Sequence, residues 1–155
     1  MSIFPTKILL ASDGSTEAEL AARTAAELAN STNSELHIIC VPDSTYHSVD
    51  LGYSYATYEE ALEAVKGETQ KVLDEQVQKV EEAGGTVKEA HLRVGERRDQ
   101  AIVHLAEDLG AGLIVMGSRG LGGVRRALMG SVSDSVVHHA HCPVMVVRPE
   151  KQRAG

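Results

Sequence analysis

The chain has 155 residues, which is about one domain and long enough to bury a substantial core. Its formal net charge of −7 argues against nucleic acid or an anionic membrane surface as the main partner. It contains no signal-peptide h-region and no apolar run of transmembrane length. The two cysteines, Cys40 and Cys142, lie in apolar, strand-like stretches, so we expect buried, reduced thiols in a cytoplasmic protein.

Short apolar runs alternate with amphipathic segments along the whole chain. In chain order, the pattern predicts a strand at 7–11, a helix at 16–30, a strand at 35–41, a helix at 57–83, a strand at 86–94, a helix at 97–109, a strand at 113–116, a helix at about 132–140 and a strand at 144–147. Thr16 with Glu19 has the pattern of a capping box at the start of the first helix. Five such alternations predict an α/β fold with a parallel sheet and right-handed crossovers. We expect a single domain over residues 1–149 and a loose tail at 150–155.

All four tyrosines gather in or just after a loop at 43–57, at positions 46, 53, 55 and 58. Their rings are expected either to cover the underlying core or to form a lid or partner surface, since tyrosine combines apolar area with a polar tip.

Residues 113–133, LIVMGSRGLGGVRRALMGSVS, carry the most informative pattern in the chain. An apolar run is typical of a strand buried on both faces, the glycines permit close backbone approach to a ligand, and Ser131 with Asp134 resembles a capping box at a helix start. A glycine loop that leads into a helix N-terminus suits a phosphate. Neither the P-loop GxxxxGK[ST] nor the dinucleotide fingerprint GxGxxG occurs in the chain.

The spacing Gly117-x-x-Gly120, nine residues, then Gly130-Ser131 resembles the ATP-binding signature of the universal stress protein family. The opening KILLASDGS, the closing CPVMVVRP and the overall length also resemble that family. The resemblance implies an open five-stranded parallel sheet of order 3-2-1-4-5 with helices on both faces, Rossmann-like and similar to the adenine nucleotide α-hydrolase fold. It also implies ATP as ligand, with Mg²⁺, in the crevice between the first and fourth strands.

Carried over by position, the resemblance implies that Asp13 accepts hydrogen bonds from the ribose hydroxyls and that the Val41 backbone contacts the adenine edge. It also implies that Ser131 and Ser133 contact the phosphates. Of the three loop arginines at 119, 125 and 126, we expect Arg119 to contact phosphate. Asp13 also suits a turn, and Ser131 a helix cap. The full predicted nucleotide site is Ala11, Ser12, Asp13, Val41, Met116, Gly117, Arg119, Gly120, Gly130, Ser131, Val132 and Ser133.

The function expected from these features is that of an ATP-binding, nucleotide-dependent regulator of the stress response, with a protein client that the sequence does not identify. The alternatives are a slow ATPase or self-phosphorylating enzyme that uses Ser131 or Ser133, and a nucleotide-free interaction module. No catalytic residue and no metal ligand is assigned. The histidines at 138, 139 and 141 suit a helix C-terminus better than a metal site.

The last predicted strand has the sequence Val144-Met145-Val146-Val147, and the implied strand order makes it a sheet edge. Because it has no internal charge or proline to protect that edge, we expect it to pair with its counterpart in a homodimer.

Overall fold

A computed structural model describes residues 2–42, 57–118 and 130–148. Its five strands are β1 (Lys7–Ser12), β2 (Glu35–Cys40), β3 (Val87–Leu92), β4 (Leu113–Gly117) and β5 (Val144–Val147). They form one parallel sheet in the order β3-β2-β1-β4-β5. The predicted α/β fold and strand order are thereby confirmed, and β3 and β5 are the two edges.

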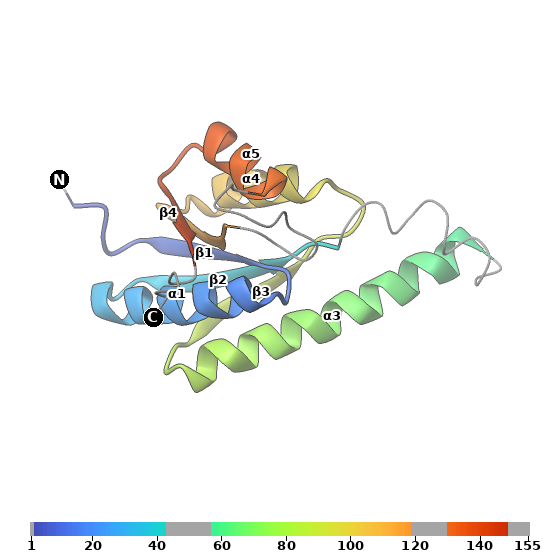
Figure 1. Ribbon diagram of the computed structural model, residues 1–155, viewed down its shortest axis with the longest axis horizontal. Helices are drawn as coiled ribbons and strands as arrows, with labels where there is room; N and C mark the ends of the chain where they lie inside the picture. The colour runs from blue at the N-terminus through green and yellow to red at the C-terminus, as the bar shows by residue number, and fades with distance from the viewer. Residues whose placement is uncertain (1, 43–56, 119–129, 149–155) are drawn as a thin grey trace, which may run out of the picture.

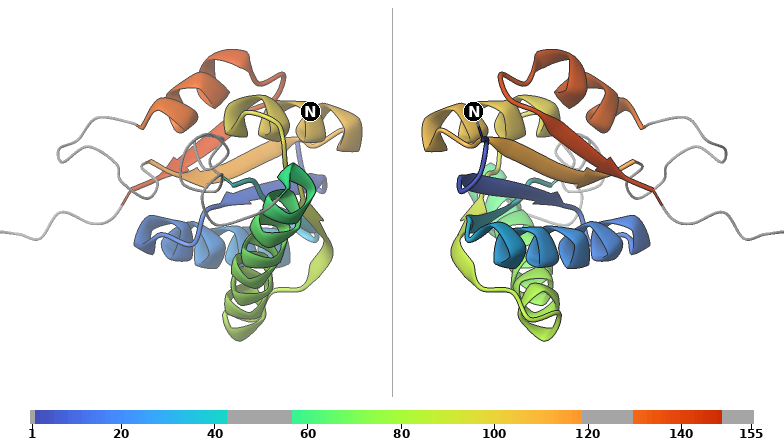
Figure 2. Two further views of the ribbon diagram at one scale, coloured as in Figure 1. Left: turned by 90° about the vertical axis from the view of Figure 1, so that its right-hand side faces the viewer. Right: turned by 90° about the vertical axis from the view of Figure 1, so that its left-hand side faces the viewer.

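Two layers of helices enclose the sheet (Figure 1). The helices are α1 (Thr16–Thr32), α3 (Tyr58–Glu82), α4 (Arg98–Leu109) and α5 (Ser131–His139). α1 and α3 cover one face and α4 and α5 the other, as the two end-on views of Figure 2 also show. α1 packs on β1 and β4, whereas α3 packs on β2 and β3.

Alternation along β1 divides the core between the two layers. Ile8 and Leu10 pack with the alanine-rich face of α1 and with α3, whereas Leu9 and Ala11 pack with α4 and α5. This follows from the two-residue period of a strand covered on both sides. The scarcity of aromatic residues leaves a core of aliphatic and alanine side chains, in which α1 lies close against the sheet.

Two helix caps differ from the predicted ones. α1 is capped by Ser15, whose Oγ accepts from the Ala18 amide at 3.1 Å, so the cap lies one residue before Thr16. The N-cap of α5 is Gly130, which has no side chain to hydrogen-bond, and Ser131 is the first helical residue. Ser15 and Thr16 offer similar capping chemistry, whereas the α5 cap is a glycine; in both cases the strand-to-helix turn decides which residue occupies the cap.

The expectations for the cysteines, the tyrosines and the tail are confirmed only in part or fall outside the described residues. Cys40 is buried, but Cys142 is only half-buried, so the prediction of two buried thiols is wrong for the second. Tyr58 is exposed at the start of α3, and the remaining tyrosines fall outside the described residues, as does the predicted tail. In the described part of the chain, no helix is long and apolar enough to cross a membrane.

Candidate functional site

The predicted site lies where the direction of the chain connections reverses in the sheet. β1 is flanked by β2 on one side and by β4 on the other, with Ala11 paired to Met116 at the carboxyl ends of β1 and β4. In open parallel sheets such a switch point leaves a crevice beyond the strand ends, where ligands bind. The structure therefore brings the residues that follow β1 next to the glycine-containing end of β4 (Figure 1).

Gly117 ends β4 against the first turn of α1. A Cβ atom built at this position would lie 3.0 Å from the Glu17 Cβ and 3.3 Å from its carbonyl carbon. The next residue, Ser118, is buried and its Oγ donates a hydrogen bond of 2.8 Å to the Glu17 Oε2. The missing side chain of Gly117 thus permits the close contact between the end of β4 and the start of α1.

A short hydrogen bond joins the two described ends of the glycine loop. The Gly130 amide donates to the Ser118 carbonyl oxygen at 2.7 Å. The buried Ser133 hydroxyl donates to the same carbonyl at 2.8 Å and lies 3.1 Å from the Gly130 carbonyl. The proton of the Ser133 hydroxyl is therefore used to close the loop, which leaves only its amide for a phosphate. Arg119 and Gly120 lie outside the described residues, as do the arginines at 125 and 126.

α5 begins with amides that its N-cap residue does not cap. Because Gly130 at the N-cap has no side chain, the first-turn N–H groups of Ser131, Val132 and Ser133 have no acceptor from the cap residue. Ser131 is exposed, Val132 is half-buried against the α4 side of the core, and Ser133 is buried. Aligned amides and the positive end of the helix dipole suit an anion at this position.

At the end of β1 the polar side chains make hydrogen bonds to other groups of the protein. The Asp13 Oδ1 accepts from the Ser15 amide at 2.9 Å, which is the turn role expected as its alternative, and Gly14 follows with φ of 83°. The Ser12 hydroxyl donates to the Oε1 of Gln76, a buried residue of α3, at 2.9 Å. Ser12 thus holds α3 against β1 and offers a ligand its backbone rather than its hydroxyl.

At the end of β2, Val41 is buried and its carbonyl oxygen accepts from the Arg98 Nε at 2.8 Å. Burial, aided by the negative charge of Asp13 and opposed by Arg98, raises the pKa of the Cys40 thiol to about 12. Cys40 is therefore a protonated, unreactive core residue beside the crevice.

One carboxylate joins the helices α4 and α5. The Asp99 Oδ2 accepts from the Ser135 hydroxyl at 2.8 Å and from the Arg97 guanidinium at 3.0 Å. Burial acts to raise the pKa of Asp99, but the hydrogen bonds from Ser135 and the Gln100 amide, with the charge of Arg97, lower it overall. This bond fixes α5, and with it the first-turn amides, relative to α4.

The histidines near the end of α5 do not converge on one point. The His138 Nε2 lies 3.5 Å from the Asp134 Oδ1, and the His139 Nδ1 lies 2.8 Å from the Ser135 carbonyl oxygen. Both contacts join residues four apart on the same helix.

Sequence reasoning missed four residues that shape the crevice: Glu17, Gln76, Arg98 and Ser118. Gln76 and Arg98 lie more than fifty residues from their partners in the chain, so no local pattern signals them. Ser118 lies inside the glycine motif, and its polar side chain directly after a buried strand is the one signal that sequence offered.

Known proteins match the chain along most of its length. The family model described as universal stress protein family matches residues 5–148. A putative universal stress protein of Staphylococcus haemolyticus is 36% identical over 145 residues, which span 93% of this chain and 85% of that protein. Among solved structures, the hypothetical protein MJ0577 has a TM-score of 0.78 at 26% identity, with 97% of this chain and all of that chain covered.

Other solved structures have the same fold. The universal stress protein UspA from Lactobacillus plantarum has a TM-score of 0.75 at 28% identity, covering 94% of this chain and 99% of its own. A universal stress protein in complex with cAMP has a TM-score of 0.67 at 23% identity, covering 95% of this chain and 99% of its own. The universal stress protein from Archaeoglobus fulgidus in complex with dAMP has a TM-score of 0.64 at 24%, covering 94% and 99%. By its family model and its relatives, this chain belongs to the universal stress protein family.

Proposed function

We propose that this protein binds ATP with Mg²⁺ in the crevice at the carboxyl ends of β1 and β4 and acts as a nucleotide-dependent regulator in the form of a homodimer. The observation that carries the proposal is the closed loop at this crevice. Ser118, Gly130 and Ser133 fix the ends of the G-2x-G-9x-GS segment, and the uncapped first turn of α5 follows directly. Such a turn suits the phosphates of a nucleotide.

The residues at the other strand ends fit the rest of the ligand. The Val41 carbonyl is already held by Arg98, so the backbone that would read the adenine edge is fixed in place before binding. Asp13 follows β1 directly, as Val41 follows the neighbouring β2, and there its carboxylate would accept from ribose hydroxyls. Two proteins of the same fold, described above, are complexes with cAMP and dAMP, which supports an adenine nucleotide as the ligand class.

A divalent cation fits the charges at the crevice. Asp13 follows β1, and Glu17 in the first turn of α1 is joined to the α5 N-terminus through Ser118. A triphosphate next to two carboxylates needs a counter-ion, and Mg²⁺ is bound in proteins through carboxylates together with phosphates. Asp13 and Glu17 are the described residues that would hold it, directly or through water.

The binding proposal is tested by calorimetry with ATP and Mg²⁺ on the full chain and on Gly130→Val. The added side chain is expected to obstruct the phosphate position and to weaken binding at least tenfold, while the circular dichroism spectrum stays unchanged. Ala90→Val, which adds similar bulk at an exposed position of β3, serves as the control and should bind like the wild type. Equal ATP affinity in Gly130→Val and the wild type would contradict the assignment.

Slow phosphoryl transfer is a second candidate function, favoured by the exposure of Ser131 at the first turn of α5. In that reaction the Ser131 Oγ attacks the γ-phosphorus, the bond from phosphorus to the ADP oxygen breaks, and the hydroxyl proton passes to water. Intact-mass analysis after incubation with ATP would show one added phosphoryl group, absent in Ser131→Ala. A chain that keeps its mass while it binds ATP would exclude this candidate.

The homodimer proposal rests on the orientation of the β5 backbone. The carbonyls of Pro143 and Val147 accept from Ile114 and Ser118 on the β4 side. Since residues of a strand point alternately to its two sides, the N–H and C=O groups of Val144 and Val146 face the open edge. Met145 adds an exposed apolar side chain to this strand. An antiparallel pair of β5 strands about a two-fold axis would satisfy these groups.

Sedimentation of Val146→Pro and Val146→Thr distinguishes the loss of pairing at the β5 edge from general damage to the fold. Proline removes the outward amide without affecting a bond to β4, so it should yield monomer or precipitate, whereas threonine keeps the amide and should remain dimeric. A wild-type chain that sediments as a monomer at micromolar concentration, with and without ATP, would refute the dimer.

A further inference from the structure

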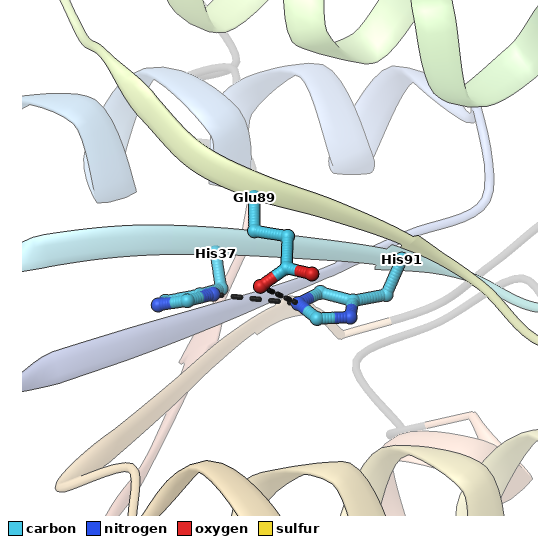
Figure 3. A group of neighbouring side chains, drawn as sticks. All are labelled: His37, Glu89 and His91. Carbon is cyan, nitrogen blue, oxygen red and sulfur yellow. Dashed lines mark hydrogen bonds and ion pairs between the residues drawn. The ribbon is translucent and has the colours of Figure 1, made fainter.

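Three potential metal ligands meet on the two strands at the β3 edge of the sheet. The His37 Nδ1 on β2 lies 3.3 Å from the His91 Nε2 on β3, and the Glu89 Oε2 lies 3.8 Å from the same His91 nitrogen. Figure 3 shows the two rings and the carboxylate converging on that nitrogen. Within the described ranges this is the one group of at least three His, Cys, Asp or Glu side chains whose ligand atoms all lie within 4.8 Å of one another.

The sheet register is what assembles the group. His37 alternates with the β2 residues that face α1 and α3, so it points to the opposite face. His37 is paired with Glu89 across the parallel strands, and His91 follows two residues later on the same face. The side chain of His37 is only 5% exposed and that of His91 15%, whereas that of Glu89 is 63% exposed. The group is therefore anchored inside the sheet and open to solvent on its carboxylate side.

Its dimensions agree with a tetrahedral metal ion. Two nitrogens bound at ~2.0–2.1 Å to one tetrahedral zinc ion are separated by about 3.3–3.4 Å, from the tetrahedral angle. The observed separation of the two imidazole nitrogens is 3.3 Å. The Glu89 oxygen is slightly too far from the His91 nitrogen, at 3.8 Å, but it belongs to an exposed and rotatable side chain.

The contact of the far nitrogen of His37 with a carboxylate also suits a metal site. The His37 Nε2 lies 3.5 Å from the Glu35 Oε2, which favours the proton on that nitrogen and leaves the Nδ1 lone pair directed into the group. A carboxylate on the far nitrogen of a histidine is the usual support of a metal ligand. A metal ion would take the place of the hydrogen bond between the two facing imidazole nitrogens.

We propose that His37, Glu89 and His91 bind a divalent transition-metal ion of the zinc type, with water as the fourth ligand. The ligands are the His37 Nδ1, the His91 Nε2 and a Glu89 carboxylate oxygen, a nitrogen-and-oxygen set that suits Zn²⁺. The ion joins the edge strand β3 to β2 through side chains in addition to the backbone ladder. The site lies on a different part of the sheet from the proposed nucleotide crevice and does not depend on that proposal.

The experiment is calorimetric titration of ZnCl₂ into the full chain, after treatment with EDTA and dialysis, in nucleotide-free buffer at pH 7.5. One ion per chain is expected to bind, and saturating zinc should raise the melting temperature because only the folded chain assembles the site. Glu89→Gln and His91→Gln replace ligands on the edge strand β3 and should each weaken binding at least tenfold. Circular dichroism without metal is the check that both variants are folded.

Surface histidines are the main source of adventitious zinc binding, and the chain offers a matched control. Replacement of His138, His139 and His141 by glutamine should leave both the stoichiometry and the affinity unchanged. Co²⁺ provides a second readout, since a four-coordinate ion gives intense visible absorption bands that His91→Gln should abolish. The proposal is overturned if zinc gives neither heat nor a shift in melting temperature, or if binding survives in Glu89→Gln and His91→Gln but disappears in the triple variant.

Discussion

The hydroxyls of Ser131 and Ser133 are two residues apart in the sequence, and the structure predicts opposite consequences when each is removed. The Ser133 hydroxyl is buried and bonds the carbonyls of Ser118 and Gly130, whereas Ser131 is exposed at the first position of α5. We therefore expect Ser133→Ala to reduce stability with little effect on ATP binding, and Ser131→Ala to reduce ATP binding with little effect on stability.

The magnitude for Ser133→Ala follows from what its partners retain. The Ser118 carbonyl keeps its hydrogen bond from the Gly130 amide, and the Gly130 carbonyl keeps the one from the Asp134 amide. No buried acceptor is left unsatisfied, so the loss is one net hydrogen bond, about 1 kcal/mol of unfolding free energy. For a chain of this size that corresponds to a fall in melting temperature of ~2–4 °C.

Ser131→Ala removes an exposed hydroxyl, and we expect its unfolding free energy to stay within about 0.5 kcal/mol of the wild type. Loss of the hydrogen bond from this hydroxyl to a charged phosphate is expected to cost about 1.5 kcal/mol, which weakens ATP binding about tenfold. Urea unfolding with a shared slope measures the first quantity and calorimetry with ATP and Mg²⁺ the second. The reasoning is refuted if Ser133→Ala leaves the urea midpoint unchanged, or if it lowers ATP affinity as much as Ser131→Ala does.

Three further predictions concern the rest of the fold. Burial raises the pKa of both thiols, that of Cys40 to about 12, but Cys40 is buried whereas Cys142 is only half-buried. Iodoacetamide at pH 8.5 should therefore label Cys142 faster than Cys40, and peptide mass spectrometry showing equal labelling of both in folded protein would contradict this. The pKa of Asp99 is lower in the folded chain than in the unfolded one, so its stabilising contribution is present above its unfolded pKa of about 3.9 and is lost as the pH falls through the folded value. Asp99→Asn should therefore be less stable than the wild type at pH 7 and differ less at pH 3, and an equal difference at both pH values would argue against this linkage. A Cβ at Gly85 would lie 2.7 Å from a side-chain carbon of α1, whereas one at Gly67, within α3, meets nothing within 4 Å. Gly85→Ala should lower the melting temperature through a loss of about 1–3 kcal/mol, and Gly67→Ala should raise it through a gain of about 0.5–1 kcal/mol; the same sign for both would refute the packing argument.

The periodicity of the sequence determined the strands, the helices and their alternation. An uninterrupted apolar run such as Leu113–Met116 indicates a strand buried on both faces, and apolar residues at helical spacing, as in 57–83, indicate a helix buried on one face. Parallel strands joined by helices then leave few topologies, and the family resemblance selected the order that the structure confirms. The position of the crevice, between the ends of β1 and β4, follows from that order alone.

Which side chains face the crevice was decided by tertiary structure. Sequence reasoning placed Ser12, Ser131 and Ser133 in one nucleotide site, but the Ser12 hydroxyl bonds to Gln76 and the Ser133 hydroxyl to the Ser118 carbonyl. These partners come from elements distant in the chain or from the far end of a loop, and a hydroxyl donates to whichever acceptor packing brings within reach.

The group of His37, Glu89 and His91 shows the same limit. The E-x-H spacing on β3 puts two ligands on one face of a strand, and this much is visible in the sequence. The third ligand, His37, comes from β2 more than fifty residues earlier, and only the strand register, with its shift between Leu36 and His37, sets it opposite Glu89. The sequence determines which residue types lie on each strand face, whereas the side-chain clusters that carry chemistry depend on how neighbouring strands align, because a shift of one residue moves a side chain to the opposite face.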